Sequence, residues 1–308
     1  MSVKFPEILF RGSRLEAKAE DATERALRNA EQHLSDRDFN RFRKLIFDLA
    51  GITLSEHKRA LVYSRLAKRL RANGLDNYSD YYELVSKAAP DSQEIVDFIN
   101  AITTNKTSFF RESHHFDYLR DEVFPEYLQQ SKNGLRRTLR IWSAGCSAGQ
   151  EPYTLAMTIR EFFGMNSNID TNILATDIDT NVLQRARQGV YNSEQIEDVP
   201  DYLLRKYFLK GKGEKKGLAK VSADLQSLIH FERLNLFDET WPMKDQLDII
   251  FCRNVIIYFN RDTQRKLITR MTGKLKPGGY LMLGHSESLH GYDSGLEHVR
   301  KNVYRYKG

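Results

Sequence analysis

A glycine-containing turn between two apolar segments restricts the fold more than any other feature of this sequence. Residues 139–144 are a short apolar run typical of a buried strand, and residues 145–149, GCSAG, follow it directly. Apolar residues then recur at helical spacing over 151–163. A strand, a tight turn and a helix in this order begin a βαβ unit, so we expect an α/β fold from about residue 135 onward.

The alternation of strands and helices continues after the turn. Further strands are expected at 173–177, 247–252 and 280–283, helices at 180–187 and 261–274, and a final edge strand at 303–306. This order predicts a doubly wound, mostly parallel sheet. The polar stretch 190–235 interrupts it, and we interpret that stretch as a small insertion with antiparallel strands at 218–221 and 228–231.

The chain before the sheet has a different, helical pattern. Helices are expected over 20–34, from Ser35 to Gly51, from Ser55 to Gly74, over 80–88 with Ser79 as the cap, and over 93–102. The predicted organisation is an N-terminal extension (1–35), a helical domain (36–100), a linker that begins the catalytic domain (101–134), and the α/β domain (135–308).

Charge and cysteine content limit the partners and the compartment. The net charge of +6 and the pI of about 9.1 favour an acidic partner, which could be nucleic acid, an anionic membrane or an acidic protein. The alternative is a basic surface that only contacts solvent. The two cysteines, Cys146 and Cys252, lack metal-site spacing and suit a reducing compartment. Without a signal peptide or a membrane-spanning run, we expect the protein in the cytoplasm.

Part of this charge lies on the second predicted helix. Six basic residues between positions 58 and 71 oppose one acid, Glu56, and three of them fall near one face: Lys58, Arg65 and Arg69. This face is interpreted either as a solvated outer surface or as a substrate-docking surface for an acidic partner.

The predicted ligand site lies beyond the carboxyl ends of the strands, where open α/β sheets bind their ligands. The turn at 145–149, Asp177 after the second strand and Asn254 after the third converge there. The turn has GxxxG spacing and not GxGxxG, and the sequence has no phosphate-binding loop, so a nucleoside cofactor without pyrophosphate, such as S-adenosylmethionine, fits better than NAD. The alternative for Asp177 is a cap on the helix that begins at Thr180.

Six segments in order resemble the chemotaxis receptor glutamate methyltransferases, the CheR family. The most specific is residues 141–157, IWSAGCSAGQEPYTLAM, which is similar to the family's cofactor-binding segment. The others are NKTSFFRE at 105–112, ATDIDTNVLQRARQGVY at 175–191, LNLFD at 234–238, IIFCRNVIIYF at 249–259 and KPGGYLMLGHSESL at 276–289. The resemblance covers about residues 36–306.

The resemblance implies a class I methyltransferase-like fold that binds S-adenosyl-L-methionine. It also implies the cofactor-binding residues, which fall on the linker and on the strand-end loops: Asn105, Thr107, Arg111, Glu151, Asp177, Asn235, Leu236, Arg253 and Asn254. Arg111 and Tyr258 would lie near the methyl group as catalytic residues. The chain departs from the family at Gln150, usually an acid, and at Ala148, often Thr or Ser.

The implied reaction transfers the methyl group to glutamate carboxylates of chemotaxis receptors, giving methyl esters and S-adenosyl-L-homocysteine. A carboxylate is ionised at neutral pH, so the in-line displacement needs positioning and not a general base. Arg111 can orient the carboxylate through a forked contact. The partners would be the cytoplasmic domains of the receptors, with the membrane reached only through them, and a receptor C-terminal peptide could add a strand to the insertion near 211–217.

Two other functions are kept as alternatives. One is a non-catalytic module that senses the cofactor or scaffolds receptors, and the less favoured one is a nucleic-acid methyltransferase, which lacks its Asn/Asp-Pro-Pro-Tyr motif here. A metal site at the adjacent His114 and His115 is not expected. The segment 284–288, GHSES, resembles a nucleophile elbow but ends in Ser, and we interpret it as a strand-end loop near the site.

Overall fold

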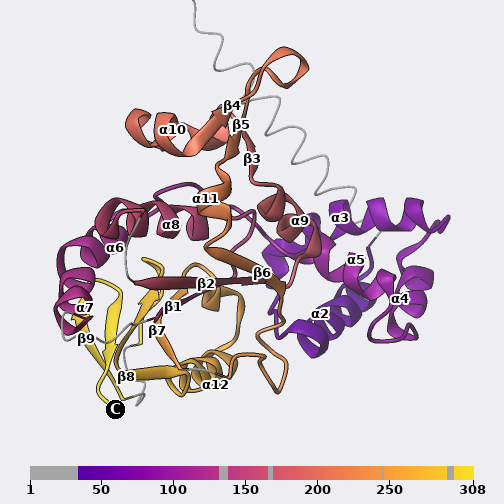
Figure 1. Ribbon diagram of the computed structural model, residues 1–308. Helices are drawn as coiled ribbons and strands as arrows, with labels where there is room; N and C mark the ends of the chain where they lie inside the picture. The colour runs from indigo at the N-terminus through magenta and orange to yellow at the C-terminus, as the bar shows by residue number, and fades with distance from the viewer. Residues whose placement is uncertain (1–33, 132–137, 166–168, 245, 290–294) are drawn as a thin grey trace, which may run out of the picture. The chain divides into compact units, whose positions relative to one another are not determined.

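The computed structural model describes residues 34–131, 138–165, 169–244, 246–289 and 295–308 (Figure 1). The contacts between residues divide the chain into two units. Residues 34–46 and 54–102 belong to the first unit, and residues 47–53 and 103–308 belong to the second. The helix expected over 20–34 lies outside the described residues, apart from its last residue.

The first unit is helical, as predicted. Its elements are α2 (Asp36–Ala50), a short 3-10 turn (Glu56–Lys58), α3 (Arg59–Ala72), α4 (Tyr78–Ser86) and α5 (Gln93–Ile102). Phe42 of α2 lies in the core against the rings of Tyr81 and Phe98. The predicted cap of the third helix is wrong: α4 begins two residues earlier, and the side chain of Asn77 accepts the backbone N–H of Asp80 (2.9 Å).

The second unit contains a seven-stranded sheet of order β6-β2-β1-β7-β8-β10-β9. Its strands are β1 (Thr138–Ala144), β2 (Asp170–Asp177), β6 (Ile229–Arg233), β7 (Leu247–Cys252), β8 (Leu275–Leu283), β9 (Leu296–Arg300) and β10 (Val303–Tyr306). The first five pair in parallel with one another, and β10 pairs antiparallel to both β8 and β9. The doubly wound, mostly parallel sheet is therefore confirmed.

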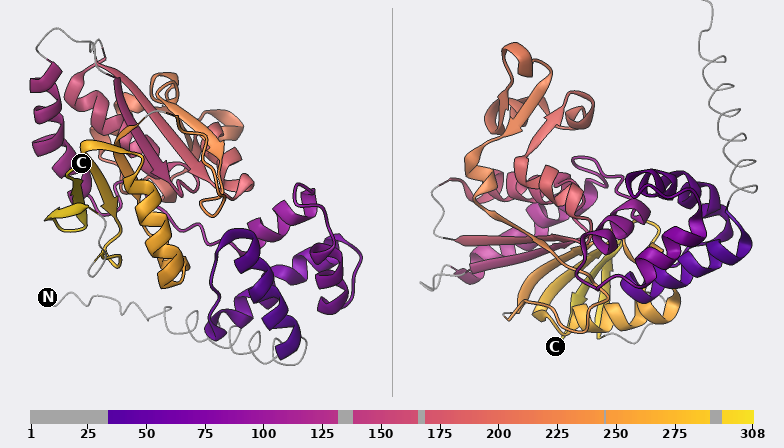
Figure 2. Two further views of the ribbon diagram at one scale, coloured as in Figure 1. Left: turned by 90° about the horizontal axis from the view of Figure 1, so that it is seen from below. Right: turned by 90° about the vertical axis from the view of Figure 1, so that its right-hand side faces the viewer.

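Helices cover both faces of this sheet. Figure 1 shows α8 (Gln150–Phe163) and α9 (Thr180–Gln188) above it and α12 (Arg261–Thr272) below it, and Figure 2 shows the same layers from the side. The core on the α8 side includes Tyr153, Phe251 and Phe116 of α6 (His114–Tyr118). Because both faces are covered, all six residues of β7 are buried, as expected for a central parallel strand.

After α6 the chain makes a π-helical turn (Leu119–Val123) and continues into α7 (Phe124–Ser131). Both elements contribute buried residues to the core of the α8 side. None of the helices in the described ranges combines the length and the apolarity that a membrane span requires.

The insertion forms a separate three-stranded antiparallel sheet that projects from the α8 side (Figure 1). Its elements are β3 (Val190–Asn192), α10 (Asp201–Tyr207), β4 (Phe208–Lys210) and β5 (Leu218–Val221), with β5 in the centre. The strand at 218–221 is confirmed. The chain returns to the main sheet through α11 (Ala223–Gln226).

Two predicted pairings are wrong. The segment 228–231 is not part of the insertion, because it enters β6, which runs parallel to β2 at the edge of the main sheet. As an edge strand, β6 exposes His230 and Arg233 and buries only Phe231, so its sequence is more polar than that of a central parallel strand. The strand at 303–306 is not the edge, because the mostly exposed β9 pairs outside it.

Candidate functional site

The strand order places a switch point between β1 and β7. From β1 the chain continues to β2 and β6 on one side, and from β7 it continues to β8 on the other. The order of the chain reverses between these two neighbouring strands, and open α/β sheets bind their ligands beyond the carboxyl ends of such strands. This is the region that the sequence predicts for the cofactor.

The turn after β1 requires its glycines. Gly145 and Gly149 have φ of 77° and 94°, in the left-handed region that favours glycine. A Cβ at Gly145 would lie 2.4 Å from a methyl group of Val255, and one at Gly149 would lie 2.9 Å from the Cβ of Ala186. The turn is thus packed between the loop after β7 and α9, and α8 begins directly after it.

Asp177, the last residue of β2, fixes this turn. Its carboxylate accepts the backbone N–H of Ser147 (2.8 Å) and that of Asp179 (2.9 Å), and the residue is 7% exposed. Burial raises the pKa of Asp177 to about 6. The alternative role as a helix cap is wrong, because Asp179 caps α9 by accepting the N–H groups of Asn181 and Val182.

Glu151, in the first turn of α8, faces a buried arginine. One of its carboxylate oxygens accepts the hydroxyl of Ser143 (2.7 Å), and the other lies 3.1 Å from Nη1 of Arg253. Burial raises the pKa of Glu151, while Arg253 opposes that shift. The guanidinium of Arg253 also lies 3.4 Å from Glu112, so it bridges two carboxylates.

The linker segment 103–112 approaches the same end of the sheet. Asn105 donates its side-chain N–H to Asp179 (2.6 Å), and its carbonyl oxygen accepts the hydroxyl of Ser147 (3.0 Å). Arg111 donates to the carbonyl oxygen of Lys106 (2.9 Å). Its own carbonyl oxygen accepts a bond from Arg253. Thr107, which lies between Asn105 and Arg111 in the sequence, is half-buried.

The loops after β6 and β7 bring the remaining predicted residues. Asn235 donates its side-chain N–H to the carbonyl oxygen of Leu49 (2.8 Å), in the segment 47–53 of the same unit, and Leu236 is buried. Asn254 directly follows Arg253 and has a φ of 58°. Tyr258 is half-buried at the end of the turn Ile256–Tyr258, and its carbonyl oxygen accepts the N–H of Thr53 (2.8 Å).

The three residues predicted to dock substrate lie in the first unit and differ in their surroundings. Lys58 is exposed. Arg65 donates to the carbonyl oxygens of Ala101 and Ile102 at the end of α5 (3.2 and 3.0 Å). Arg69 forms ion pairs with Glu94 (2.5 Å) and Asp97 (3.0 Å) of α5. The two arginines therefore join α3 to α5.

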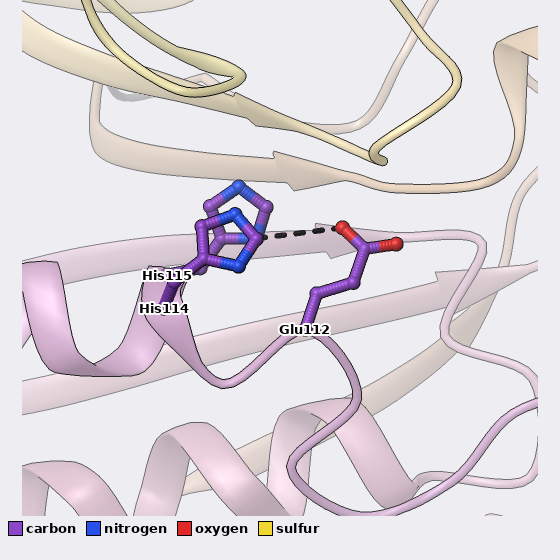
Figure 3. Close-up of side chains that lie close together, drawn as sticks. All are labelled: Glu112, His114 and His115. Carbon is purple, nitrogen blue, oxygen red and sulfur yellow. Dashed lines mark ion pairs between the residues drawn. The ribbon is translucent and has the colours of Figure 1, made fainter.

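Glu112 is a residue of this region that the sequence analysis missed. Figure 3 shows its carboxylate beside the rings of His114 and His115. His115 is fully buried, and burial together with Arg253 lowers its pKa to about 3. Glu112 also receives a bond from the His285 ring (2.9 Å). Because the positive charge of Arg253 lies 3.4 Å from Glu112 and would repel a cation there, the group suits an ion pair better than a divalent cation.

Comparison with known proteins identifies the family. Residues 105–305 match the family described as "CheR methyltransferase, SAM binding domain", and residues 37–103 match "CheR methyltransferase, all-alpha domain". The chain belongs to the CheR methyltransferase family. The predicted resemblance is thereby confirmed.

Individual relatives match over most of their length. The chain is 42% identical over 276 residues to "Chemotaxis protein methyltransferase 2" of Pseudomonas aeruginosa, covering 90% of this chain and 95% of that protein. It is 41% identical over 256 residues to "Chemotaxis protein methyltransferase" of Escherichia coli, covering 83% and 86%. A "Chemotaxis protein methyltransferase" of Borreliella burgdorferi is 37% identical over 278 residues, covering 90% and 96%.

The cofactor of this family is S-adenosylmethionine, and the site's chemistry fits it. Asp177 and Glu151 present acceptors at the carboxyl end of the sheet, as ribose hydroxyls and a cationic amino group require. The glycine turn after β1 allows the backbone to approach the ligand. When bound, the cofactor supplies an electrophilic methyl group on a sulfonium.

Proposed function

We propose that this methyltransferase esterifies glutamate side chains of chemotaxis receptors. The observation that carries the proposal is the match of residues 105–305 to the family's SAM binding domain. In its support, the guanidinium of Arg253, next to Asn254, donates to the carbonyl oxygen of Arg111. The methyl transfer would take place in the cytoplasm, on the cytoplasmic domains of the receptors. The enzyme would contact the membrane only through the receptors and would not bind nucleic acid.

In this proposal the cofactor-binding residues hold the methyl donor in a fixed orientation. Asp177 and Glu151 would accept bonds from the ribose and the amino group, and Asn105, Thr107, Asn235, Leu236, Arg253 and Asn254 would border the rest of the molecule. Arg253 also acts on a neighbouring carboxylate, because burial raises the pKa of Glu151 and the positive charge of Arg253 opposes that shift.

Arg111 and Tyr258 are the proposed catalytic residues. The guanidinium of Arg111 would hold the receptor carboxylate, and the Tyr258 hydroxyl would donate to the same group. A carboxylate oxygen placed about 3–3.5 Å from the methyl carbon can attack it without losing a proton, so orientation supplies the rate enhancement. The sulfur is the leaving group and keeps the electron pair of the broken bond.

The test is methyl transfer from S-adenosylmethionine with a labelled methyl group to membranes that carry chemotaxis receptors. A glutamate methyl ester releases methanol in mild alkali, whereas N-methyl and C-methyl products do not. Label on the receptors that is released as methanol is the expected result. Alkali-stable label, or binding of S-adenosylhomocysteine without any transfer, would contradict the proposed substrate.

The insertion offers a second contact for the receptor. We propose that the peptide at a receptor C-terminus adds a strand to β4, an edge of the small sheet whose Leu209 is 64% exposed. Main-chain hydrogen bonds to an edge strand allow many different peptide sequences to bind. The exposed side chain of Leu209 would add an apolar contact with the peptide.

Binding of a labelled receptor C-terminal peptide, followed by fluorescence anisotropy, tests this contact. Leu209→Asp is expected to abolish binding. Val190→Asp, at an exposed residue of the opposite edge strand β3, is the matched control and should bind like the wild type. If the wild type does not bind at high micromolar peptide, or if only Val190→Asp loses binding, the proposal for β4 is wrong.

A further inference from the structure

A buried carboxylate, Glu287, holds the loop after β7. The residue is 3% exposed and lies in the loop that follows β8. Its Oε2 accepts the backbone N–H groups of Asn254 (2.8 Å) and Gly284 (2.6 Å). Its Oε1 accepts those of Val255 (2.9 Å) and Ile257 (3.3 Å). One side chain thus serves four donors from two loops.

A carboxylate suits this place because of the geometry of the loops. After β7 ends, the N–H groups of residues 254, 255 and 257 have no neighbouring strand to accept them. A buried donor without an acceptor is destabilising, and an ionised carboxylate offers about four acceptor positions. The Glu287 carboxylate therefore accepts the hydrogen bonds that the carbonyl groups of a neighbouring strand would otherwise accept.

The close approach of the two loops is also required by Gly284. A Cβ at this position would lie 2.8 Å from the backbone nitrogen of Asn254 and 2.6 Å from its Nδ2. Glycine lets the backbone of the β8 loop reach Asn254, and the Glu287 carboxylate then joins the two segments.

The loop held in this way carries predicted site residues. Asn254 has a φ of 58°, a conformation that the surrounding contacts must maintain. Val255 packs against Gly145 of the turn after β1. Tyr258 closes the same turn, and its N–H bonds to the carbonyl oxygen of Val255 (3.2 Å). A shift of this loop would move both the wall of the cofactor turn and the proposed catalytic tyrosine.

We propose that Glu287 is a positioning residue of the methyltransferase: it fixes Asn254, Val255 and Tyr258 in the arrangement that binds the cofactor and orients the methyl acceptor. The part that concerns the methyl acceptor rests on the proposed function. Glu287 acts on these residues through the backbone N–H groups that its carboxylate accepts.

The test is Glu287→Gln, which keeps the shape of the side chain but replaces one acceptor oxygen with an N–H donor. Calorimetric titration with S-adenosylhomocysteine gives the stoichiometry and the Kd separately, and steady-state transfer to receptor membranes gives kcat and the KM for receptor. We expect a stoichiometry near one site, a Kd and a kcat that are each worse by about tenfold or more, and an unchanged KM for receptor.

Asp248→Asn is the matched control. Asp248 is a buried carboxylate of β7, 9% exposed, that accepts the N–H of Arg140 (2.8 Å) and pairs with Lys276 (2.7 Å) near the amino end of that strand. Its substitution is expected to lower the Tm but to leave the Kd and the kcat per binding site within about twofold of the wild type, since no site residue depends on it.

The outcomes separate the possible roles. If Glu287→Gln lowers only the stoichiometry or the Tm, with the Kd and the kcat per binding site unchanged, its role is merely structural and the proposal is overturned. If the variant does not fold, Glu287→Asp is measured in the same way, because it keeps the charge and shortens the reach. A wild type that binds S-adenosylhomocysteine but does not methylate receptors contradicts the proposed substrate, and the Kd comparison still decides the role of Glu287.

Discussion

Asp177 and Glu151 are two carboxyl groups at the carboxyl end of the sheet, and burial there disfavours the ionised form of both. Burial raises the pKa of Asp177 to about 6 and that of Glu151 above its usual value. A raised pKa means that the native state binds more protons than the unfolded state between the usual carboxyl pKa and pH 6. Ionisation of Asp177 therefore lowers stability as the pH rises through this window.

Cofactor binding should show the opposite pH dependence. Ribose hydroxyls donate to an ionised carboxylate, so we expect the affinity for S-adenosylhomocysteine to fall below pH 6 by up to about tenfold per pH unit. The variant Asp177→Asn should bind S-adenosylhomocysteine weakly at all pH values. Its affinity should no longer change with pH around pH 6. Calorimetric titration between pH 5 and 8 measures the Kd of both proteins. If the affinity of the variant falls with pH as steeply as that of the wild type, Asp177 is not the group responsible.

Tyr258 allows a second prediction at the level of one atom. Tyr258→Phe removes the hydroxyl and leaves the ring, so we expect kcat for receptor methylation to fall about tenfold, the value of one hydrogen bond to a charged group. The Kd for S-adenosylhomocysteine should change less than about twofold. Equal losses in kcat and in cofactor affinity would instead place Tyr258 at the cofactor.

The sequence could predict that certain polar residues lie at the carboxyl ends of the strands, but not which residues hold the loops around them. Asp177 and Asn254 follow from strand ends, because parallel strands present their carboxyl ends at one edge. Glu287 and Glu112 act across 33 and 142 positions, respectively, on Asn254, and such contacts have no periodic pattern. The segment GHSES was correctly interpreted as a loop near the site, but its glutamate was not recognised.

At the scale of elements, α3 illustrates why charge alone does not define a docking surface. Lys58 lies in the 3-10 turn before α3, and the basic residues Arg65 and Arg69 of α3 both bind α5 within the first unit. The pair with Arg69 and the bond from Tyr81 lower the pKa of the Glu94 carboxyl, against the effect of burial. The exposed cations of the same helix are Lys68 and Arg71.

This difference gives a prediction for α3. Lys68→Glu with Arg71→Glu should lower kcat/KM for receptor several-fold, by charge repulsion with an acidic partner, and leave the Tm unchanged. Arg69→Ala should instead lower the free energy of unfolding by about 2 kcal/mol, since it leaves Glu94 without its charged partner. Thermal unfolding and receptor methylation of both variants check this, and an unchanged kcat/KM in the double variant would exclude α3 as the docking surface.

Element types were easier to predict than strand pairings. Apolar runs identified β7 because both of its faces are covered, and period-3.6 patterns identified the helices of the first unit. The placement of β6 failed, because an edge strand has an exposed side whatever its direction. β10 was predicted as the edge because the mostly exposed β9, which pairs outside it, was not predicted as a strand. Direction is set by the partner strand, which can lie many residues away, as β2 does for β6.

At the scale of the molecule, the segment 47–53 is bound to the second unit although the chain around it belongs to the first. Ile52 forms a β-bridge with Phe259, and the Phe47 ring packs against Phe237. A Cβ at Gly51, whose φ is 70°, would lie 2.7 Å from the ring of Phe237. The contacts of this segment border the loops that carry Asn235 and Tyr258.

Gly51 therefore provides a test with an internal control. Gly51→Ala should lower the free energy of unfolding by about 2 kcal/mol, from backbone strain and the clash with Phe237. Gly74→Ala has similar strain, with a φ of 65°, but its Cβ would have no neighbour within 4 Å, so a loss of about 1 kcal/mol is expected. Chemical denaturation measures both, and equal losses would contradict the importance of the segment.

Because residues 47–53 belong to the second unit, the second unit cannot be expressed alone as one continuous segment that starts at residue 103. The polypeptide passes from one unit to the other three times, at 46–47, 53–54 and 102–103. A fragment cut at residue 103 would lack the bridge to Phe259 and the carbonyl acceptor of Asn235. An expression fragment that keeps these contacts should therefore begin before residue 47.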